Sequence, residues 1–125
     1  MNTQATEAVQ YFPVVGAPGM TSEAARPYDA RWYVVDAMGR PLDGDVAGLR
    51  NVSVDIRFGY LVLRAPDMLR LDIPLDVIED DPSVLETLQL DGVAVQAADE
   101  GAWAAAWFTQ VLGQPARLLK VCVPA

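Results

Sequence analysis

The sequence predicts a mainly β fold with one α-helix in its C-terminal half. Short segments rich in β-branched and aromatic residues recur at roughly ten-residue spacing, as in small β-barrels and sandwiches. Residues 51–58 alternate between apolar and polar side chains, which is the period of a half-buried strand. Residues 99–112 carry apolar side chains at helical spacing. Together these observations predict a β-barrel of many short strands, or a sandwich, that the helix plugs.

The first half of the chain contains most of the expected strands. Residues 9–15 read as a strand with Pro13 at an edge or an end, and a short extended stretch is expected at 23–26. Residues 31–36 (RWYVVD) form an aromatic and β-branched strand. A hairpin joins 51–58 to 60–64 across Gly59. In its first strand, one face is expected to hold Val52, Val54, Ile56 and Phe58.

The second half is expected to hold three more extended regions and the helix. The strands are 69–73, a hairpin around Asp91 and Gly92, and 116–123. The helix is expected to span about 99–112, between a capping residue at its start and a glycine that ends it. Asp99 would cap the helix, Glu100 would suit the positive end of its dipole, and Gly113 would end it. Trp107 lies on the core-facing stripe of this helix. Trp103 lies at the edge of that stripe and is also expected to pack in the core.

Length and charge narrow the class of protein. The 125 residues suit one domain, expected over 9–123 behind a flexible N-terminus at 1–8. The formal net charge of −8 disfavours nucleic acid, whose affinity comes mostly from Lys and Arg. No apolar run approaches a membrane span of about 20 residues, and the N-terminus has no signal-peptide core, so we expect a soluble, cytoplasmic protein without membrane contact.

Few residues are candidates for chemistry. The chain has no histidine, which removes imidazole catalysis and His-ligated zinc, and its one cysteine excludes an internal disulfide. Cys122 is interpreted as a small apolar residue of a strand. The alternative is a reactive thiol whose pKa is lowered by Lys120 on the same strand face. Asp43-Gly44-Asp45 lacks the further oxygen ligands of a calcium loop, so it is interpreted as a solvated turn and no metal site is expected.

Five segments in order resemble the MOSC N-terminal β-barrel domain, which precedes the MOSC domain in molybdenum cofactor sulfurases and amidoxime-reducing enzymes. The matching stretches are Tyr11–Val14 (Y-P-V), Asp29–Asp36 with Gly39–Leu42 after it (D-R-x-W-x-V-x-D), Leu61–Met68 (L-x-L-x-A-P-G-M), Asp99–Gly101 (D-C-G) and Trp107–Leu118 (W-x-x-x-L-G-x-P-x-R-L). The resemblance covers about residues 9–122 and implies a β-barrel with a helix.

The cofactor-binding pattern of that family is lost here. In the family, a Lys-Ser pair, the arginine of D-R-x-W and a T-x-R motif hold the pterin phosphate of the molybdenum cofactor. Val15 and Gly16 occupy the Lys-Ser positions, and Ala30 occupies the position of the arginine. The T-x-R positions hold Asp43 and Asp45, and the cysteine of D-C-G is replaced by Glu100. Each lost charge-assisted hydrogen bond is worth about 2 kcal/mol, and a facing carboxylate adds repulsion. No cofactor is therefore expected at these degenerate positions.

The preferred hypothesis is a freestanding, non-catalytic binding or accessory module, because the chain ends where the MOSC domain would begin. Its partner would be a separate MOSC-domain protein acting in trans, or a small ligand. One alternative is a molybdenum-cofactor-binding or sulfur-carrier enzyme component that uses Cys122. Another is a structural domain that self-associates through an open strand edge; the sequence leaves the oligomeric state open.

Overall fold

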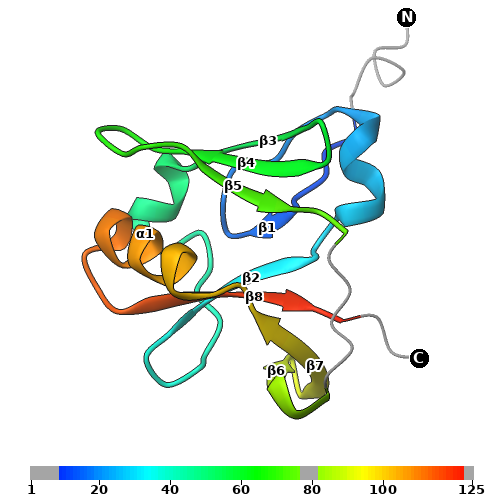
Figure 1. The fold of residues 1–125 in the computed structure, drawn as a ribbon, viewed down its shortest axis with the longest axis vertical. Coiled ribbons are helices and arrows are strands. Elements are labelled where there is room, and N and C mark those ends of the chain that lie inside the picture. The colour runs from blue at the N-terminus through cyan, green and yellow to red at the C-terminus, as the bar shows by residue number, and fades with distance from the viewer. Residues whose placement is uncertain (1–8, 77–81, 123–125) are drawn as a thin grey trace, which may run out of the picture.

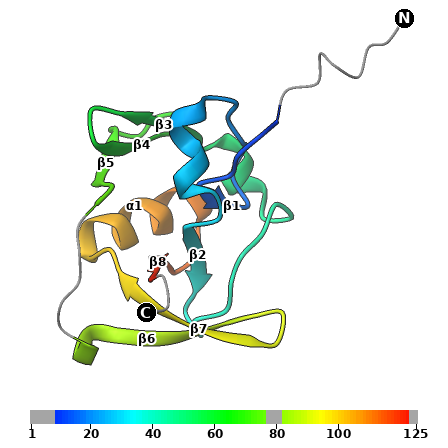
Figure 2. The same cartoon turned by 90° about the vertical axis from the view of Figure 1, so that its right-hand side faces the viewer.

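Two β-sheets enclose the single long helix in the computed structural model, which describes residues 9–76 and 82–122 (Figure 1). The five-stranded sheet has the order β1 (Val14–Val15), β2 (Trp32–Asp36), β8 (Ala116–Val121), β7 (Val93–Asp99) and β6 (Leu85–Leu90). The three-stranded sheet has the order β3 (Ser53–Arg57), β4 (Tyr60–Arg64) and β5 (Leu71–Pro74). The helix α1 (Ala102–Leu112) lies between the two sheets in both views (Figures 1 and 2).

Consecutive strands pair within the three-stranded sheet and in β6–β7, whereas β8 lies between β2 and β7 and so joins distant parts of the chain. β1 pairs with β2 in parallel, whereas every other strand pair is antiparallel. Three 3₁₀ helices complete the described elements: η2 (Glu23–Tyr28), η3 (Ala47–Asn51) and η4 (Pro82–Val84). No helix in the described part of the chain is long and apolar enough to span a membrane.

The main core joins both sheets to the helix. Trp32, Val34 and Leu118 reach it from the five-stranded sheet, and Leu61 and Leu63 reach it from β4. From α1, the side chains of Ala104, Trp107 and Phe108 fill the space between the sheets. A smaller cluster of Val35, Leu88, Ala97 and Leu119 lies on the other face of the five-stranded sheet. The helix therefore buries one apolar stripe against both sheets.

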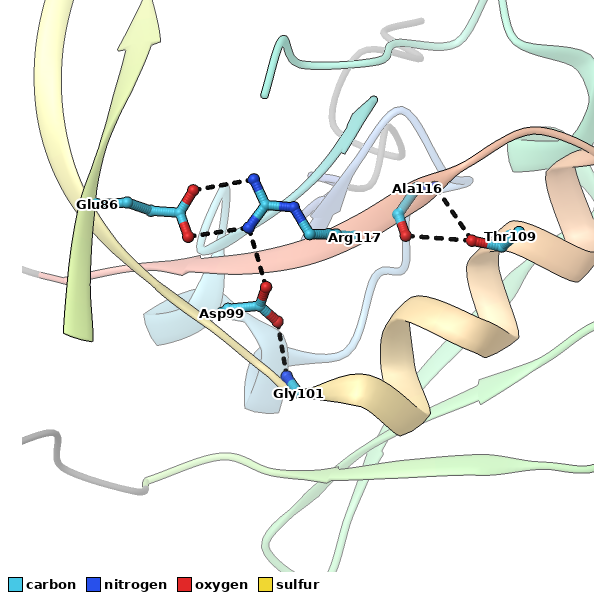
Figure 3. A network of polar contacts seen from close by, with 6 residues as sticks. All are labelled: Glu86, Asp99, Gly101, Thr109, Ala116 and Arg117. Carbon is cyan, nitrogen blue, oxygen red and sulfur yellow. Dashed lines mark hydrogen bonds and ion pairs between the residues drawn. The ribbon is translucent and has the colours of Figure 1, made fainter. Parts of the chain in front are cut away.

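An arginine on β8 ties the β6–β7 hairpin to the rest of its sheet (Figure 3). The two terminal nitrogens of Arg117 each donate to Glu86 on β6, at 2.9 and 3.0 Å. The same guanidinium contacts Asp99 at the end of β7 at 3.0 Å. Both carboxylates raise the pKa of Arg117 above its ordinary value. Arg117 therefore links β8 to β6 by a bidentate charge-assisted hydrogen bond to Glu86 and to the end of β7 by a second one to Asp99.

The predicted mainly β fold with one late helix is confirmed. Among the described residues the two sheets share no strand pairing, so these strands form open sheets and not the continuous ladder of a closed barrel. The hairpin at Asp91–Gly92 and the stop at Gly113, which has φ +71°, are as predicted. The expected flexible segment 1–8 and residue 123 lie outside the described residues.

The helix begins at Ala102 and not at Asp99. Asp99 ends β7, and the N–H of Glu100 still donates to the Leu118 carbonyl at 2.9 Å, which continues the sheet. Gly101, with φ +108°, then turns the chain into the helix, and its N–H donates to Asp99 Oδ1 at 2.7 Å. Tertiary pairing therefore overrides the capping signal that Asp99 and Glu100 give in the sequence.

Three local expectations are wrong. Residues 23–26 belong to the 3₁₀ helix η2, because Ser22 caps it by accepting the Ala24 N–H at 3.2 Å. Phe58 is 95% exposed, since it has φ +52° in the β3–β4 turn and leaves the apolar face of β3. Trp103 is 87% exposed, because it lies outside the stripe of Ala104, Trp107 and Phe108 that α1 buries.

Candidate functional site

A pocket of about 440 Å³ opens between the start of the five-stranded sheet and the tip of the β6–β7 hairpin. Its walls combine apolar side chains with two carboxylates, a phenol and an amide. The lining residues are Val15, Tyr33, Pro41, Leu42, Asp43, Gln89, Leu90 and Asp91. Small-ligand sites commonly have such a mixed lining of apolar surface and a few polar groups.

A tight turn after β2 brings Asp43 to this pocket. Asp36 Oδ1 accepts the N–H groups of Met38 and Arg40, at 2.8 and 3.0 Å, which reverses the chain. Leu42 then returns beside β2 and donates its N–H to the Val34 carbonyl at 2.8 Å. Asp43 consequently lies next to the end of β1.

Gly16 packs directly on the backbone of Asp43. It has φ +96°, a conformation that favours glycine. A Cβ atom at this position would lie 2.9 Å from Leu49 Cδ1 and 3.1 Å from the carbonyl carbon of Asp43. Position 16 therefore does not accept a side chain while the 43–45 loop keeps this place.

The pocket is electrostatically negative. Asp43 and Asp91 both line it, and none of its lining residues is Lys or Arg. Burial raises the pKa of the Tyr33 hydroxyl, and the charges of Asp91 and Asp29 raise it further. These groups disfavour an anion in the pocket and favour a neutral hydrogen-bonding group or a cation.

The arginines Arg31, Arg40 and Arg50 do not offset the negative charge of the pocket. Arg40 forms an ion pair with Asp36 at 3.1 Å, and Arg31 lies near the Pro27 carbonyl at 3.5 Å. Arg50 donates its Nε–H to the Gly44 carbonyl at 2.7 Å but does not line the pocket.

Of the positions that the sequence resemblance matched to a cofactor-binding pattern, the structure brings some together and separates others. Val15 and Asp43 line the pocket, Gly16 supports it, and the Asp45 N–H donates to Asp43 Oδ1 at 3.0 Å within the adjoining turn. Ala30 does not line it; its N–H donates to the Phe12 carbonyl at 2.8 Å, before the start of β2.

Glu100 belongs to a different, partly buried cluster. Trp32 donates its Nε1–H to Glu100 Oε2 at 2.6 Å, and Tyr28 stacks on the Trp32 ring with centroids 6.0 Å apart. The Lys120 ammonium lies 5.6 Å from the centre of the Trp32 ring. Burial raises the pKa of Glu100, while the Trp32 hydrogen bond and the Lys120 charge oppose that rise.

Sequence reasoning did not find this cluster. Trp32 and Glu100 are 68 residues apart, and no spacing rule links them. The local signal in the sequence is a carboxylate, Glu100, beside Gly101 at a turn. That pattern favours a residue at the positive end of the helix dipole, so it does not predict the contact with the Trp32 ring.

Cys122 is half-buried after the end of β8. Its thiol lies 3.8 Å from the Lys120 carbonyl, and its N–H donates to the Gln96 carbonyl at 2.9 Å. The Lys120 ammonium instead reaches the Leu75 carbonyl, so it is engaged away from the sulfur. The reactive thiol stays a prediction. Among the described residues, no group of three or more Cys, Asp or Glu side chains is arranged to hold a metal ion.

The fold and the pocket define a mainly β protein with a cavity that has apolar walls and two carboxylates in its lining. No protein-family model and no curated protein matches the chain. The solution structure of a Bordetella bronchiseptica protein, solved as a structural genomics target, is similar to it, with 45% sequence identity and a TM-score of 0.78. That similarity covers 93% of this chain and 90% of the Bordetella chain. The chain belongs to the same family as the Bordetella protein.

Proposed function

We propose that this protein is a non-catalytic binding or accessory module, related to the MOSC N-terminal domain, whose molybdenum-cofactor site has degenerated. The observation that carries this proposal is the acidic pocket. Positions that the resemblance assigns to the phosphate grip, Val15 and Asp43, line one cavity that has carboxylates and no cation in its wall. A phosphate needs N–H donors and positive charge, so this wall does not fit it.

The backbone at Gly16 supports the same proposal. A serine at this position, as the family pattern has it, would place its Cβ within 2.9 Å of Leu49 and would need an unfavourable positive φ. The loss of the phosphate grip therefore involves the packing of the 43–45 loop as well as charge.

The same pocket suits a basic group on a partner. Asp43 and Asp91 would pair with an ammonium or guanidinium, while Val15 and Leu42 would cover its aliphatic stem. We therefore favour a Lys or Arg side chain of a partner protein, such as a separate MOSC-domain protein acting in trans, as the occupant.

Titration of the purified protein with molybdenum cofactor tests the lost phosphate site. We expect no binding at micromolar cofactor, because the carboxylates repel the phosphate. The triple variant Val15→Lys, Asp43→Thr, Asp45→Arg restores the family's Lys, Thr and Arg at three of the matched positions, removes two carboxylates, and should bind more tightly than the wild type. Micromolar binding by the unaltered protein would contradict the proposal.

A second titration tests the preference for a cation. Spermidine and free citrate serve as probes of opposite charge, read by amide shifts of Tyr33, Leu42 and Gln89 in nuclear magnetic resonance spectra. We expect spermidine to shift these amides and citrate to leave them in place. Asp43→Asn should weaken the spermidine response, whereas Asp55→Asn on β3, outside this pocket, should not; the reverse order would contradict the assignment.

A further inference from the structure

The outer face of the three-stranded sheet carries an arginine-rich pocket of about 290 Å³. Three arginines line it, although the whole chain has only nine Lys and Arg residues and a net charge of −8. The lining residues are Arg57, Phe58, Tyr60, Val62, Arg64, Arg70 and Asp72. The opposite face of this sheet packs on the core that includes α1, and the arginine-rich pocket shares no lining residue with the acidic pocket described above. Figure 2 shows the three-stranded sheet and the β6–β7 hairpin on opposite sides of α1.

Strand alternation puts these side chains together. Leu61 and Leu63 of β4 point into the core, so Tyr60, Val62 and Arg64 point outward. Arg57 on β3 pairs directly with Tyr60, and Asp72 on β5 pairs directly with Val62. Val62 is only 5% exposed although it lies on the outer face, which indicates that the longer side chains around it close over the sheet.

Among residues 9–76 and 82–122, few partners take up the hydrogen-bonding capacity of these arginines. Asp55 Oδ2 accepts the Nε–H of Arg57 at 2.6 Å, and Asp72 Oδ1 lies 3.0 Å from the Nε of Arg70. Within the part of the chain that the structure describes, no further side chain binds the terminal nitrogens of Arg57 or Arg70, and Arg64 has no ion pair at all. Three guanidiniums against two carboxylates leave an excess of positive charge.

Aromatic rings lie beside this charge. Phe58 is almost fully exposed at the β3–β4 turn, and Tyr60 is partly exposed on the adjoining strand. Flat apolar rings at the surface offer area on which another ring can stack, and arginine planes extend that area.

We propose that this face binds a small planar organic anion, a single ring that carries a carboxylate or a phosphate ester. The ring stacks against Tyr60 and Phe58, and the anionic group accepts hydrogen bonds from Arg64 and from the free terminal nitrogens of Arg57 and Arg70. The pocket volume suits a one-ring ligand and not a dinucleotide.

The test uses the full chain, labelled with ¹⁵N, and four probes: benzoate, phenyl phosphate, acetate and benzylamine. We expect benzoate and phenyl phosphate to shift the amides of β4 and of residues 70–72 in a saturable way at millimolar concentration. Acetate, which lacks a ring, should bind more weakly, and benzylamine, which has the opposite charge, should leave these amides in place. A stronger response to one of the two aromatic anions identifies the carboxylate or the phosphate ester as the preferred group.

Arg64→Gln provides the decisive variant, since this side chain is exposed and its loss breaks no ion pair. We expect it to weaken binding by about tenfold, the usual effect of losing one charge-assisted hydrogen bond. Arg26→Gln, an exposed arginine on η2, is the matched control and should leave the affinity unchanged. Absence of saturable shifts with both aromatic anions, or equal affinities for the two variants, would overturn the proposal.

Discussion

Glu100 shows how one residue acquires a role that its sequence neighbours do not suggest. Its carboxylate accepts the Nε1–H of Trp32, and burial raises its pKa above the ordinary value of 4.5. A carboxyl group whose pKa is raised in the folded state binds its proton more tightly there than in the unfolded chain. Its stabilising contribution is fully present at pH values below its ordinary pKa. That contribution is lost as pH rises through the raised value, because the folded state must then hold a buried charge.

Glu100→Gln should therefore change the pH dependence of stability. The amide oxygen still accepts the Trp32 N–H, but the side chain no longer ionises. We expect the free energy of unfolding of the variant, relative to wild type, to increase as pH rises above 4.5 and then to level off. Urea unfolding at several pH values measures this difference, with Asp45→Asn as a control for the removal of one exposed charge. A constant difference across the range would contradict the assignment.

Gly16 carries a second prediction at the residue scale. Gly16→Ala should destabilise the protein by about 2 kcal/mol or more, because it combines a positive φ with a close approach to Leu49 and to the Asp43 backbone. Gly44→Ala is the matched control, since a Cβ there meets only the Gly16 carbonyl at 3.8 Å; we expect it to change stability by less than about 0.5 kcal/mol. Denaturant unfolding compares them, and equal stabilities would show that the 43–45 loop gives way.

At the scale of elements, the β6–β7 hairpin depends on the link to Arg117. The hairpin lies at the end of the five-stranded sheet, and its connection to the helix passes through Asp99 and Gly101 (Figure 3). Arg117 contacts carboxylates on both hairpin strands, so it supports the element that forms one wall of the acidic pocket.

Arg117→Met keeps the aliphatic stem but removes these bonds. We expect a loss of about 1 kcal/mol in stability, since the group is partly exposed and solvent screens it. Amide hydrogen exchange should accelerate in β6 and β7 more than in β3 to β5. Arg40→Met, which breaks an exposed ion pair in the 36–40 turn, is the control. Uniform acceleration over both sheets would count against a local role.

Element identity was well predicted where the local pattern and the tertiary contacts agree. The alternation in 51–58 appears as β3, with Val52 buried and Val54 and Ile56 packed on the core. The prediction fails where a residue of the same apolar pattern lies at the end of a strand or at the edge of the buried stripe of the helix. Phe58 continues the apolar series in sequence, but the hairpin turn takes it away from the core. Trp103 lies one turn before Trp107, yet Trp107 is buried and donates its Nε1–H to the Leu69 carbonyl at 2.7 Å, whereas Trp103 is exposed.

At the scale of the whole molecule, one core connects both sheets through Phe108. Because Phe108 is fully buried in the cluster that includes residues of both sheets, we expect Phe108→Ala to lower stability by about 3–5 kcal/mol. Far-ultraviolet circular dichroism and tryptophan fluorescence should show one shared transition in the wild type and a common shift in the variant. Separate transitions for the two probes would show that the sheets unfold independently and would contradict a single domain.

The charge distribution is also a property of the whole molecule. A net charge of −8 suggests an acidic surface throughout, but the fold separates the signs. Asp43 and Asp91 meet at one pocket from loops far apart in the sequence, while Arg57, Arg64 and Arg70 meet on the outer face of the other sheet. The two proposed sites therefore have opposite electrostatic preferences within one small chain.

The sequence by itself determined the mainly β class and the late helix with its glycine stop. These features depend on periodicity, backbone preference and residue type, which are local. The tertiary structure decided which positions meet: Val15 with Asp43 in the acidic pocket, Glu100 with Trp32, and the three arginines over β4. Such contacts depend on strand register and on turns that join distant segments, and no local pattern contains that information.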